Sequence, residues 1–354
     1  MVRCRVGHRR SGQRNRFGAH GVAVTARHEP DPAVLEAAAA RIAGVALETP
    51  LLQSPALDAR AGGRVLLKAE CLQRTGSFKI RGACNRLAQI PPQERERGVV
   101  AWSSGNHAQG VAEAARLLGM RATVVMPADT PRRKLEATRR LGAEIWLYDR
   151  YREDREAIGR AIAAERGATL VPSYDDYAVI AGQGTVGLEI CRQARALGPV
   201  PDRILVCCGG GGLSAGIALA AESLAPAAEI WAVEPAAFDD TARSLARGRR
   251  ETVAPDARSV CDALLTPSPG RLTFPVLRRR LAGVLTVTDE QAVAAMRYAF
   301  EELHLVLEPG GAVALAALLA GKVDTGGTSV VVLSGGNVAA EDFCRLTGAG
   351  GGAA

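Results

Sequence analysis

Residues 98–126, GVVAWSSGNHAQGVAEAARLLGMRATVVM, indicate the fold class of this chain. Gly98–Trp102 is a short apolar run rich in β-branched residues, which predicts a buried strand. In His107–Leu118 apolar residues recur every three or four positions, which predicts a helix with one apolar face. Ala122–Met126 predicts a second strand. A strand, a helix and a second strand in succession form one unit of a parallel sheet.

The same alternation continues on both sides of this unit. A helix is expected from Asp31 to Ile42, because Asp31 can cap its first turn and Pro32 suits the first helical position. Further helices are expected after Thr130-Pro131 and at Asp154–Glu165. Further strands are expected at Ile145–Tyr148, Arg203–Cys208, Glu229–Val233 and Ser329–Leu333. Repeated units of this kind predict an α/β fold built on doubly wound parallel sheets.

The basic charge of the chain is concentrated in one terminal segment. The 354 residues carry a net charge of +7, and residues 1–30, with seven arginines and one acidic residue, contribute +6 of it. The remainder is nearly neutral, so we expect no nucleic-acid partner for the folded part. The longest apolar stretches are too short to span a bilayer, so no membrane association is expected.

Residues 1–30 have little apolar content and no helical or strand periodicity, so we expect a disordered Arg-rich extension. A transit peptide and a nucleic-acid-binding arm both remain open. We favour an extension without a function of its own, because no apolar or amphipathic targeting segment occurs. Residues 346–354, rich in Gly and Ala, are expected to be a flexible tail.

The eight cysteines suggest neither a metal site nor a disulfide framework. None of them form a CxxC pair, and they do not cluster with histidines. Because no secretory signal occurs either, we expect reduced thiols and a cytoplasmic location.

Four segments carry residues suited to chemistry, and the first is Thr75–Gly82, TGSFKIRG. Lys79 lies between Phe78 and Ile80, and a lysine in apolar surroundings loses solvation of its ammonium form. Its amine then becomes available as a nucleophile toward a carbonyl. On this segment alone, however, a surface lysine that extends past apolar neighbours explains the pattern equally simply.

The other three segments are turns that follow predicted strands. Residues 103–110, SSGNHAQG, open a helix whose N-terminal N–H groups suit a carboxylate or phosphate. Residues 209–216, GGGGLSAG, allow close approach of the backbone to a phosphate. A nicotinamide-binding turn is the rival interpretation of the glycines, with Glu234 as the ribose-binding acid, although the GxGxxG spacing does not occur. Residues 334–338, SGGNV, follow the last strand, and ligands of such sheets bind outside the carboxyl ends of strands.

Together the four segments resemble pyridoxal-phosphate (PLP) enzymes of the serine/threonine dehydratase family, which includes threonine ammonia-lyases and serine racemases. The likeness extends over roughly Asp31 to Arg345 and includes IAGQGT at 180–185 and LEPG at 307–310. It implies two doubly wound parallel-sheet domains of PLP fold type II, the tryptophan synthase β-like kind. Residues 31–97 and 176–345 would form the large PLP-binding domain, and residues 98–175 the small domain.

The resemblance also implies roles for individual residues. Lys79 would bind PLP covalently, and Phe78 would lie against the cofactor ring. Asn106 would bind the ring hydroxyl, and Ser334 the pyridine nitrogen, which a neutral partner leaves largely unprotonated. The phosphate would lie in the turn formed by Gly209, Gly210, Gly211, Gly212 and Leu213. The substrate carboxylate would bind to the turn that contains Ser103, Ser104, Asn106 and His107.

The implied reaction is β-elimination from a small β-hydroxy amino acid such as threonine or serine, which releases a 2-oxo acid and ammonia. Lys79 would remove the Cα proton. Ser104 would provide an acid/base on the opposite face, as in racemases, so a serine racemase remains an alternative. A 3-hydroxyaspartate dehydratase is another alternative, because such enzymes look similar at Ser104. A catalytically silent amino-acid-binding protein is a third, against which the intact Lys79 argues.

Two further expectations come from the resemblance. Glu234, Phe238 and Asp240 resemble a divalent-cation site, in which two carboxylates and the Phe238 carbonyl would bind Mg²⁺ or Ca²⁺. The family more often has Ala-Asp-Gly where this chain has Cys261-Asp-Ala, followed by the unusual residues 265–270. This departure leaves the substrate side chain undecided, and a bulkier or acidic one stays possible. A homodimer is the expected assembly.

Overall fold

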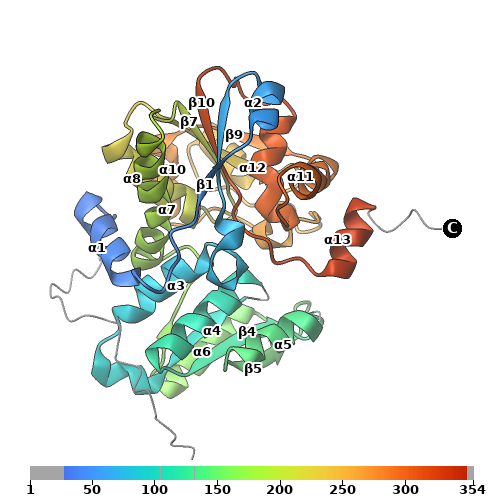
Figure 1. Cartoon of the computed structure of the whole chain (residues 1–354). Helices are drawn as coiled ribbons and strands as arrows, with labels where there is room; N and C mark the ends of the chain where they lie inside the picture. The colour runs from blue at the N-terminus through green and yellow to red at the C-terminus, as the bar shows by residue number, and fades with distance from the viewer. Residues whose placement is uncertain (1–27, 104, 131, 349–354) are drawn as a thin grey trace, which may run out of the picture.

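The computed structural model describes residues 28–103, 105–130 and 132–348, and in them the chain forms two β-sheets (Figure 1). The larger sheet has the order β1-β2-β10-β7-β8-β9 and the smaller one β5-β4-β3-β6. The larger sheet comprises β1 (Leu51–Gln53), β2 (Arg64–Lys68), β7 (Arg203–Cys207), β8 (Glu229–Pro235), β9 (Leu281–Val287) and β10 (Thr328–Val332). The smaller one comprises β3 (Val99–Trp102), β4 (Ala122–Pro127), β5 (Glu144–Tyr148) and β6 (Thr169–Leu170).

All strand pairs are parallel except the edge pair β1–β2, which is antiparallel. In the unit that opened the sequence analysis, Val99 pairs with Ala122 and Trp102 with Val125. The six strands expected from the sequence are therefore confirmed, with ends that differ by one or two residues. β1, β2, β6 and β9 were not expected, because they are short or only partly apolar.

Helices cover both faces of the larger sheet, with α7, α8 and α10 on one side and α11 and α12 on the other (Figure 1). The four expected helices are confirmed as α1, α4, α5 and α6, and Asp31 caps α1 by accepting a hydrogen bond from the backbone N–H of Val34 at 2.8 Å. The α-helices are α1 (Pro32–Ile42), α2 (Pro55–Ala61), α3 (Lys79–Ala88), α4 (Asn106–Leu118), α5 (Arg132–Arg140), α6 (Arg155–Arg166), α7 (Tyr177–Ala196), α8 (Gly212–Leu224), α9 (Asp240–Arg247), α10 (Thr273–Arg280), α11 (Asp289–Glu302), α12 (Pro309–Leu319) and α13 (Ala340–Thr347). Short 3₁₀ turns are η1 (Glu70–Leu72), η2 (Arg74–Gly76), η3 (Pro92–Arg97) and η4 (Asp262–Leu264).

Each sheet has its own apolar core, and α3 lies where the two cores meet. Buried residues of α3, among them Ile80 and Leu87, pack with the smaller sheet and α4. The opposite side of α3 packs against α7, where a Cβ on Gly182 would lie 2.6 Å from the Cα of Gly82. Only glycines permit this approach of two helix backbones. The domain boundaries at 97/98 and 175/176 stay a prediction.

A buried ionic cluster joins α3 to the larger sheet. Arg81, 1% exposed, donates to Glu70 at 2.7 and 2.8 Å and to Glu189 at 2.5 and 2.8 Å. Lys68 Nζ donates to Glu189 at 2.6 Å. Burial opposes ionisation of Glu70, but the adjacent Arg81 guanidinium prevails and holds the pKa of this carboxyl below its usual value. Because each charge is paired, the cluster fixes Arg81, and with it the start of α3, two residues after Lys79.

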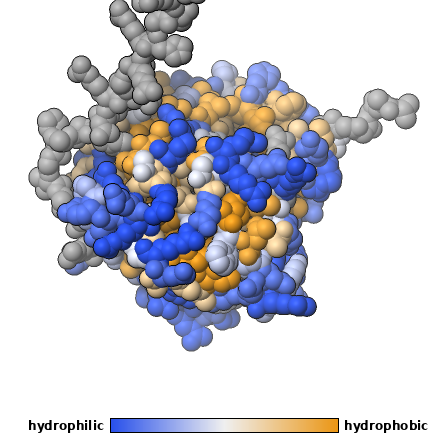
Figure 2. Space-filling model, turned by 90° about the horizontal axis from the view of Figure 1, so that it is seen from below, coloured by the Kyte–Doolittle hydropathy of each residue, from blue (hydrophilic) through white to orange (hydrophobic). Residues whose placement is uncertain are grey.

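No helix among the described residues is long and apolar enough to cross a membrane. Seen from the side of the smaller sheet, the surface consists mostly of hydrophilic residues with apolar residues between them (Figure 2).

Candidate active site

A cavity of about 590 Å³ lies between the two sheets, where turns after β3, β7 and β10 meet. Parallel strands bring these turns to the same place because their carboxyl ends lie on the same side of a sheet. The residues predicted to bind the cofactor all line the cavity: Phe78, Lys79, Asn106, Gly209–Leu213 and Ser334. Ser103 and His107, predicted to bind substrate, line it as well. Ser104 lies outside the described residues.

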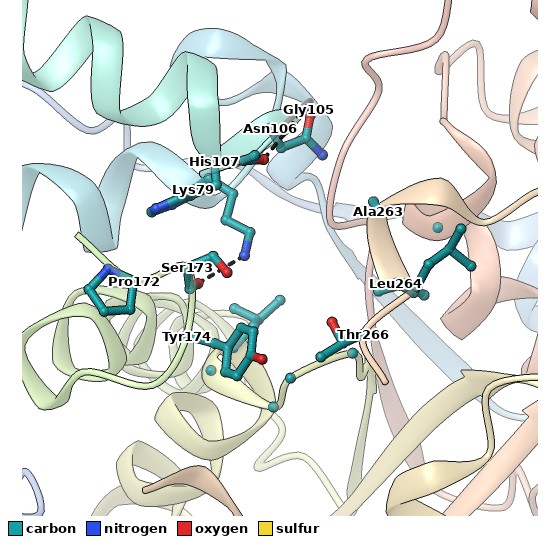
Figure 3. Close-up of a pocket in the computed structure, with 18 of the residues that line it drawn as sticks. Lys79, Gly105, Asn106, His107, Pro172, Ser173, Tyr174, Ala263, Leu264 and Thr266 are labelled. Atoms are coloured by element: carbon teal, nitrogen blue, oxygen red, sulfur yellow. Dashed lines mark hydrogen bonds between the residues drawn. The ribbon is translucent and has the colours of Figure 1, made fainter. Parts of the chain in front are cut away.

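The Lys79 side chain points from the first residue of α3 into the cavity (Figure 3). Its Nζ donates to the carbonyl of Ser173 at 3.0 Å and lies 5.0 Å from the centre of the Phe78 ring. Loss of water around the amine lowers the pKa of Lys79 to about 8, although the neighbouring Cys207 thiol and Glu308 carboxyl oppose this shift. Near neutral pH a substantial share of this amine is therefore uncharged and nucleophilic.

Backbone hydrogen bonds tie the lysine segment to the turn after β10. Ser77 and Gly335 form an isolated antiparallel bridge. The N–H of Phe78 donates to the carbonyl of Ser334 at 3.3 Å, and the N–H of Gly336 donates to that of Gly76 at 2.9 Å. Two segments more than 250 positions apart thus act as one rigid floor of the cavity.

A chain of side-chain amides crosses this floor. Asn337 Nδ2 donates to Asn106 Oδ1 and to the carbonyl of Thr75, both at 2.7 Å. Asn106 Nδ2 in turn donates to Glu308 Oε1 at 2.5 Å. Burial raises the pKa of Glu308 to about 7, and Asp262 adds to the shift. Asn106 is therefore held from two sides, with its orientation fixed.

The turn after β7 forms a pocket of backbone N–H groups at the start of α8. Gly211 has a φ of +88°, a conformation that side chains disfavour. A Cβ on Gly210 would lie 2.4 Å from the ring of Tyr174, and one on Gly212 would lie 3.0 Å from the Tyr174 Cβ. Because α8 begins here, its unpaired N–H groups and helix dipole favour an anion such as a phosphate.

The turn after β3 has the same character at the start of α4. The N–H of Gly105 donates to Ser103 Oγ at 3.2 Å, and Asn106 is the first residue of the helix. The His107 ring is 2% exposed, and its Nε2 lies 2.8 Å from the carbonyl of Val171. Burial, together with the Lys79 charge, lowers the pKa of His107 to about 3, so the imidazole is neutral. This turn can therefore bind a carboxylate through helix N–H groups, without a cationic imidazole.

Glu234, Phe238 and Asp240 lie next to one another but do not line the cavity. The Glu234 carboxylate accepts the N–H groups of Thr241 and Ala242 at 3.0 and 3.1 Å. Asp240 Oδ2 is buried, and no partner within hydrogen-bond distance is found for it among the described residues. Burial raises the pKa of Glu234 to about 8 and that of Asp240 to about 7. Across the described ranges, no group of three His, Cys, Asp or Glu side chains with metal-ligand geometry occurs.

Several cavity residues had no role in the sequence analysis. Glu308 belongs to the LEPG segment, where a glutamate directly before a helix-starting proline marked the place but not its contact with Asn106. Ser173 and Tyr174 come from the connection between β6 and α7, which has no motif. Cys207 ends β7, and its Sγ lies 3.2 Å from Ser334 Oγ. Residues 262–266 also line the cavity, so the unusual segment lies beside it.

These residues fit PLP. The cavity holds an amine that can react with its aldehyde, a glycine turn whose backbone leaves room for its phosphate, and a hydroxyl on Ser334 that can meet its ring nitrogen. The neutral partner at Ser334, in place of a carboxylate, suits a ring nitrogen without a proton.

Comparisons with known proteins agree with this assignment. The family model described as "Pyridoxal-phosphate dependent enzyme" matches residues 42–335. The L-threo-3-hydroxyaspartate ammonia-lyase of a Pseudomonas species is 45% identical over 310 residues, which are 87% of this chain and 96% of that protein.

Two solved structures share the fold. A threonine deaminase from the organism abbreviated T.th. has a TM-score of 0.82 and 45% identity, with coverage of 88% of this chain and 99% of that one. Maize serine racemase has a TM-score of 0.85 and 36% identity, with coverage of 90% and 97%. These likenesses confirm the expected α/β architecture of PLP fold type II. The chain belongs to the family of pyridoxal-phosphate dependent enzymes.

Proposed function

We propose that the chain is an ammonia-lyase that removes the β-hydroxyl group and the amine of a small β-hydroxy amino acid, with a 2-oxo acid and ammonia as products. The observation that carries the proposal is the Lys79 amine, whose pKa of about 8 and place between two anion-binding turns suit proton transfer at a substrate Cα. The ammonia-lyase among the relatives supports the same reaction class.

Binding of the substrate rests on the N-terminus of α4. Its free N–H groups would bind the substrate carboxylate, with Ser103 and Asn106 as polar neighbours and the neutral His107 as part of the wall. Ser104 belongs to the same turn and would face the substrate as a second acid/base. The Lys79 amine, which now donates to the Ser173 carbonyl, would take the Cα proton.

The cofactor would be held by the other residues of the cavity. Gly209, Gly210, Gly211, Gly212 and Leu213 would bind its phosphate, and Phe78 would lie against its ring. Asn106, fixed by Asn337 and Glu308, would bind the ring hydroxyl, and Ser334 the ring nitrogen. PLP supplies the electron-withdrawing ring that makes the Cα proton of a bound amino acid acidic.

The range of substrates follows from the charge of the cavity wall. Besides Lys79, the basic side chains of Lys134, Arg155, Arg160, Arg250 and Arg271 line the cavity. A second carboxylate would find cations there, so 3-hydroxyaspartate joins threonine and serine as a proposed substrate.

Racemisation of serine in the same cavity is the second candidate function. It requires an acid/base on each face of the substrate Cα, and Lys79 with Ser104 would provide them. The likeness to maize serine racemase favours it. Recovered serine of unchanged chirality after prolonged incubation would eliminate this candidate.

A divalent cation, Mg²⁺ or Ca²⁺, would be held by Glu234, Asp240 and the Phe238 carbonyl. The unpartnered Asp240 oxygen and two adjacent buried carboxyls are the features that such a cation would satisfy. It would stabilise the turn between β8 and α9, close to Cys208 and the glycine turn.

We also propose a homodimer in the cytoplasm. The apolar side chains of Leu47, Leu72 and Val306 are each about half exposed, and all three lie near the turns of η1 and Gly336. A second copy of the chain would cover them. The seven cysteines of the described residues are all free thiols, in keeping with a reducing compartment.

The first prediction concerns turnover. Purified holoenzyme, supplied with L-threonine, L-serine or L-threo-3-hydroxyaspartate, releases 2-oxo acid and ammonia from at least one of them. Lys79→Ala lowers kcat at least about a thousandfold, because the proton acceptor and the covalent anchor are both lost. Lys322→Ala, an exposed lysine, serves as the control and keeps full activity. A Lys79→Ala enzyme with near-normal turnover would refute the role of this lysine.

The second prediction concerns pH. Because only the uncharged Lys79 amine attacks an aldehyde, the rate at which the apo-protein incorporates PLP should follow the deprotonated fraction. With a pKa of about 8, that fraction rises about fivefold from pH 7 to pH 8 and levels off above pH 9. Absorbance measured by stopped flow reports the rate. A rate that keeps rising about tenfold per pH unit up to pH 10 would contradict the lowered pKa.

The third prediction concerns the cation. Dialysis against EDTA should lower the melting temperature, because a cation bound only to the native state stabilises it, and Mg²⁺ or Ca²⁺ should restore it. Asp240→Asn should remove the response to both treatments. Equal melting temperatures with and without chelator would argue against the site.

A further inference from the structure

Cys207 lies at the junction of the glycine turn and the turn after β10. It is the last residue of β7, lines the cavity and is 4% exposed. β7 and β10 are neighbouring parallel strands, with Leu205 paired to Val331. Two residues further along, Cys207 Sγ lies 3.2 Å from Ser334 Oγ, which is a short hydrogen bond for sulfur.

The direction of this hydrogen bond follows from the state of the thiol. Burial raises the pKa of Cys207 to about 11, against the opposing effects of Ser334 and Lys79, so the thiol keeps its proton. The S–H therefore donates, and Ser334 Oγ accepts. Within the part of the chain that the structure describes, the Ser334 hydroxyl has no other hydrogen-bond partner, so its own hydrogen can point into the cavity.

We propose that Cys207 is a positioning residue, whose thiol donates to Ser334 and thereby makes the Ser334 hydroxyl a hydrogen-bond donor to the ring nitrogen of the cofactor. The inference rests on the proposed role of Ser334. A hydroxyl can donate or accept, and only a donating hydroxyl suits a ring nitrogen without a proton. Cys207 selects this orientation, and each bond of the relay S–H···O–H···N polarises the next.

The neighbouring Cys208 provides a contrast on the same strand end. Its Sγ contacts the carbonyl of Gly209 and Thr241 Oγ1, each at 3.6 Å, and does not reach Ser334. It is as buried as Cys207, at 1% exposed. Replacement of Cys208 therefore reproduces the loss of a buried thiol without loss of the relay.

The test uses holoenzyme reconstituted with PLP that carries ¹⁵N in its ring. In the wild type, the ¹⁵N chemical shift should be that of an unprotonated, hydrogen-bonded pyridine. In Cys207→Ala and Cys207→Val, it should move toward the value of a more weakly bonded nitrogen. The dissociation constant of PLP should increase by about threefold to tenfold, as expected for loss of one neutral hydrogen bond. Cys207→Ser, which retains a donor, should restore both values, and Cys208→Ala should leave both unchanged.

Three results would overturn the inference. A pyridinium shift in the wild type would mean that Ser334 accepts rather than donates. Wild-type shift and affinity in both Cys207→Ala and Cys207→Val would mean that the thiol has no positioning role. Equal changes in Cys208→Ala would indicate a general packing effect. Because none of these readouts needs a substrate, they remain valid even if the ammonia-lyase activity is absent.

Discussion

The desolvation of one primary amine is the constraint on which the rest of the site depends. Among the described residues Lys79 has no carboxylate partner at salt-bridge distance, and its Nζ donates to a backbone carbonyl instead. An ammonium group in such surroundings is unfavourable, and the pKa of Lys79 falls to about 8 as a result. A lysine with a close carboxylate partner would keep its proton and would react slowly with an aldehyde. The reactive amine thus requires that acidic groups stay at a distance.

The protein supports this amine with strong interactions placed just outside the cavity. Arg81, which follows Lys79 by two residues in α3, is paired with Glu70 and Glu189. On the other side, Ser77 pairs with Gly335 and fixes the lysine segment against the turn that carries Ser334. The free energy for holding Lys79 in an unfavourable place is therefore supplied by neighbours that take no part in proton transfer. The same floor fixes Asn106 through Asn337 and Glu308.

Much of this arrangement could be predicted from the sequence, for identifiable reasons. The strand–helix–strand unit at 98–126 has strong apolar periodicity, and parallel topology then brings every strand-end turn to one edge. Lys79, Asn106, Gly209 and Ser334 were expected in one site because each belongs to such a turn or to a recognisable motif.

The remaining features depend on contacts between distant segments, which no local pattern encodes. Tyr174 packs on Gly210 and Gly212 only because the β6–α7 connection passes over the glycine turn. Cys207 was indistinguishable from its neighbour Cys208 until the strand pairing turned one thiol toward Ser334 and the other toward Thr241. The neutral state of His107 likewise follows from burial against Val171, a residue of another strand end.

The most direct measurement is the identification of the lysine that carries the cofactor. The chain has four lysines, Lys68, Lys79, Lys134 and Lys322, so the assignment is simple. Reduction of the holoenzyme with borohydride fixes the cofactor to its lysine, and mass spectrometry of the peptides then locates it. We expect the added mass on the peptide that contains Lys79 and on no other. Added mass on Lys68, Lys134 or Lys322, or no added mass in protein that retains PLP absorbance, would contradict the account.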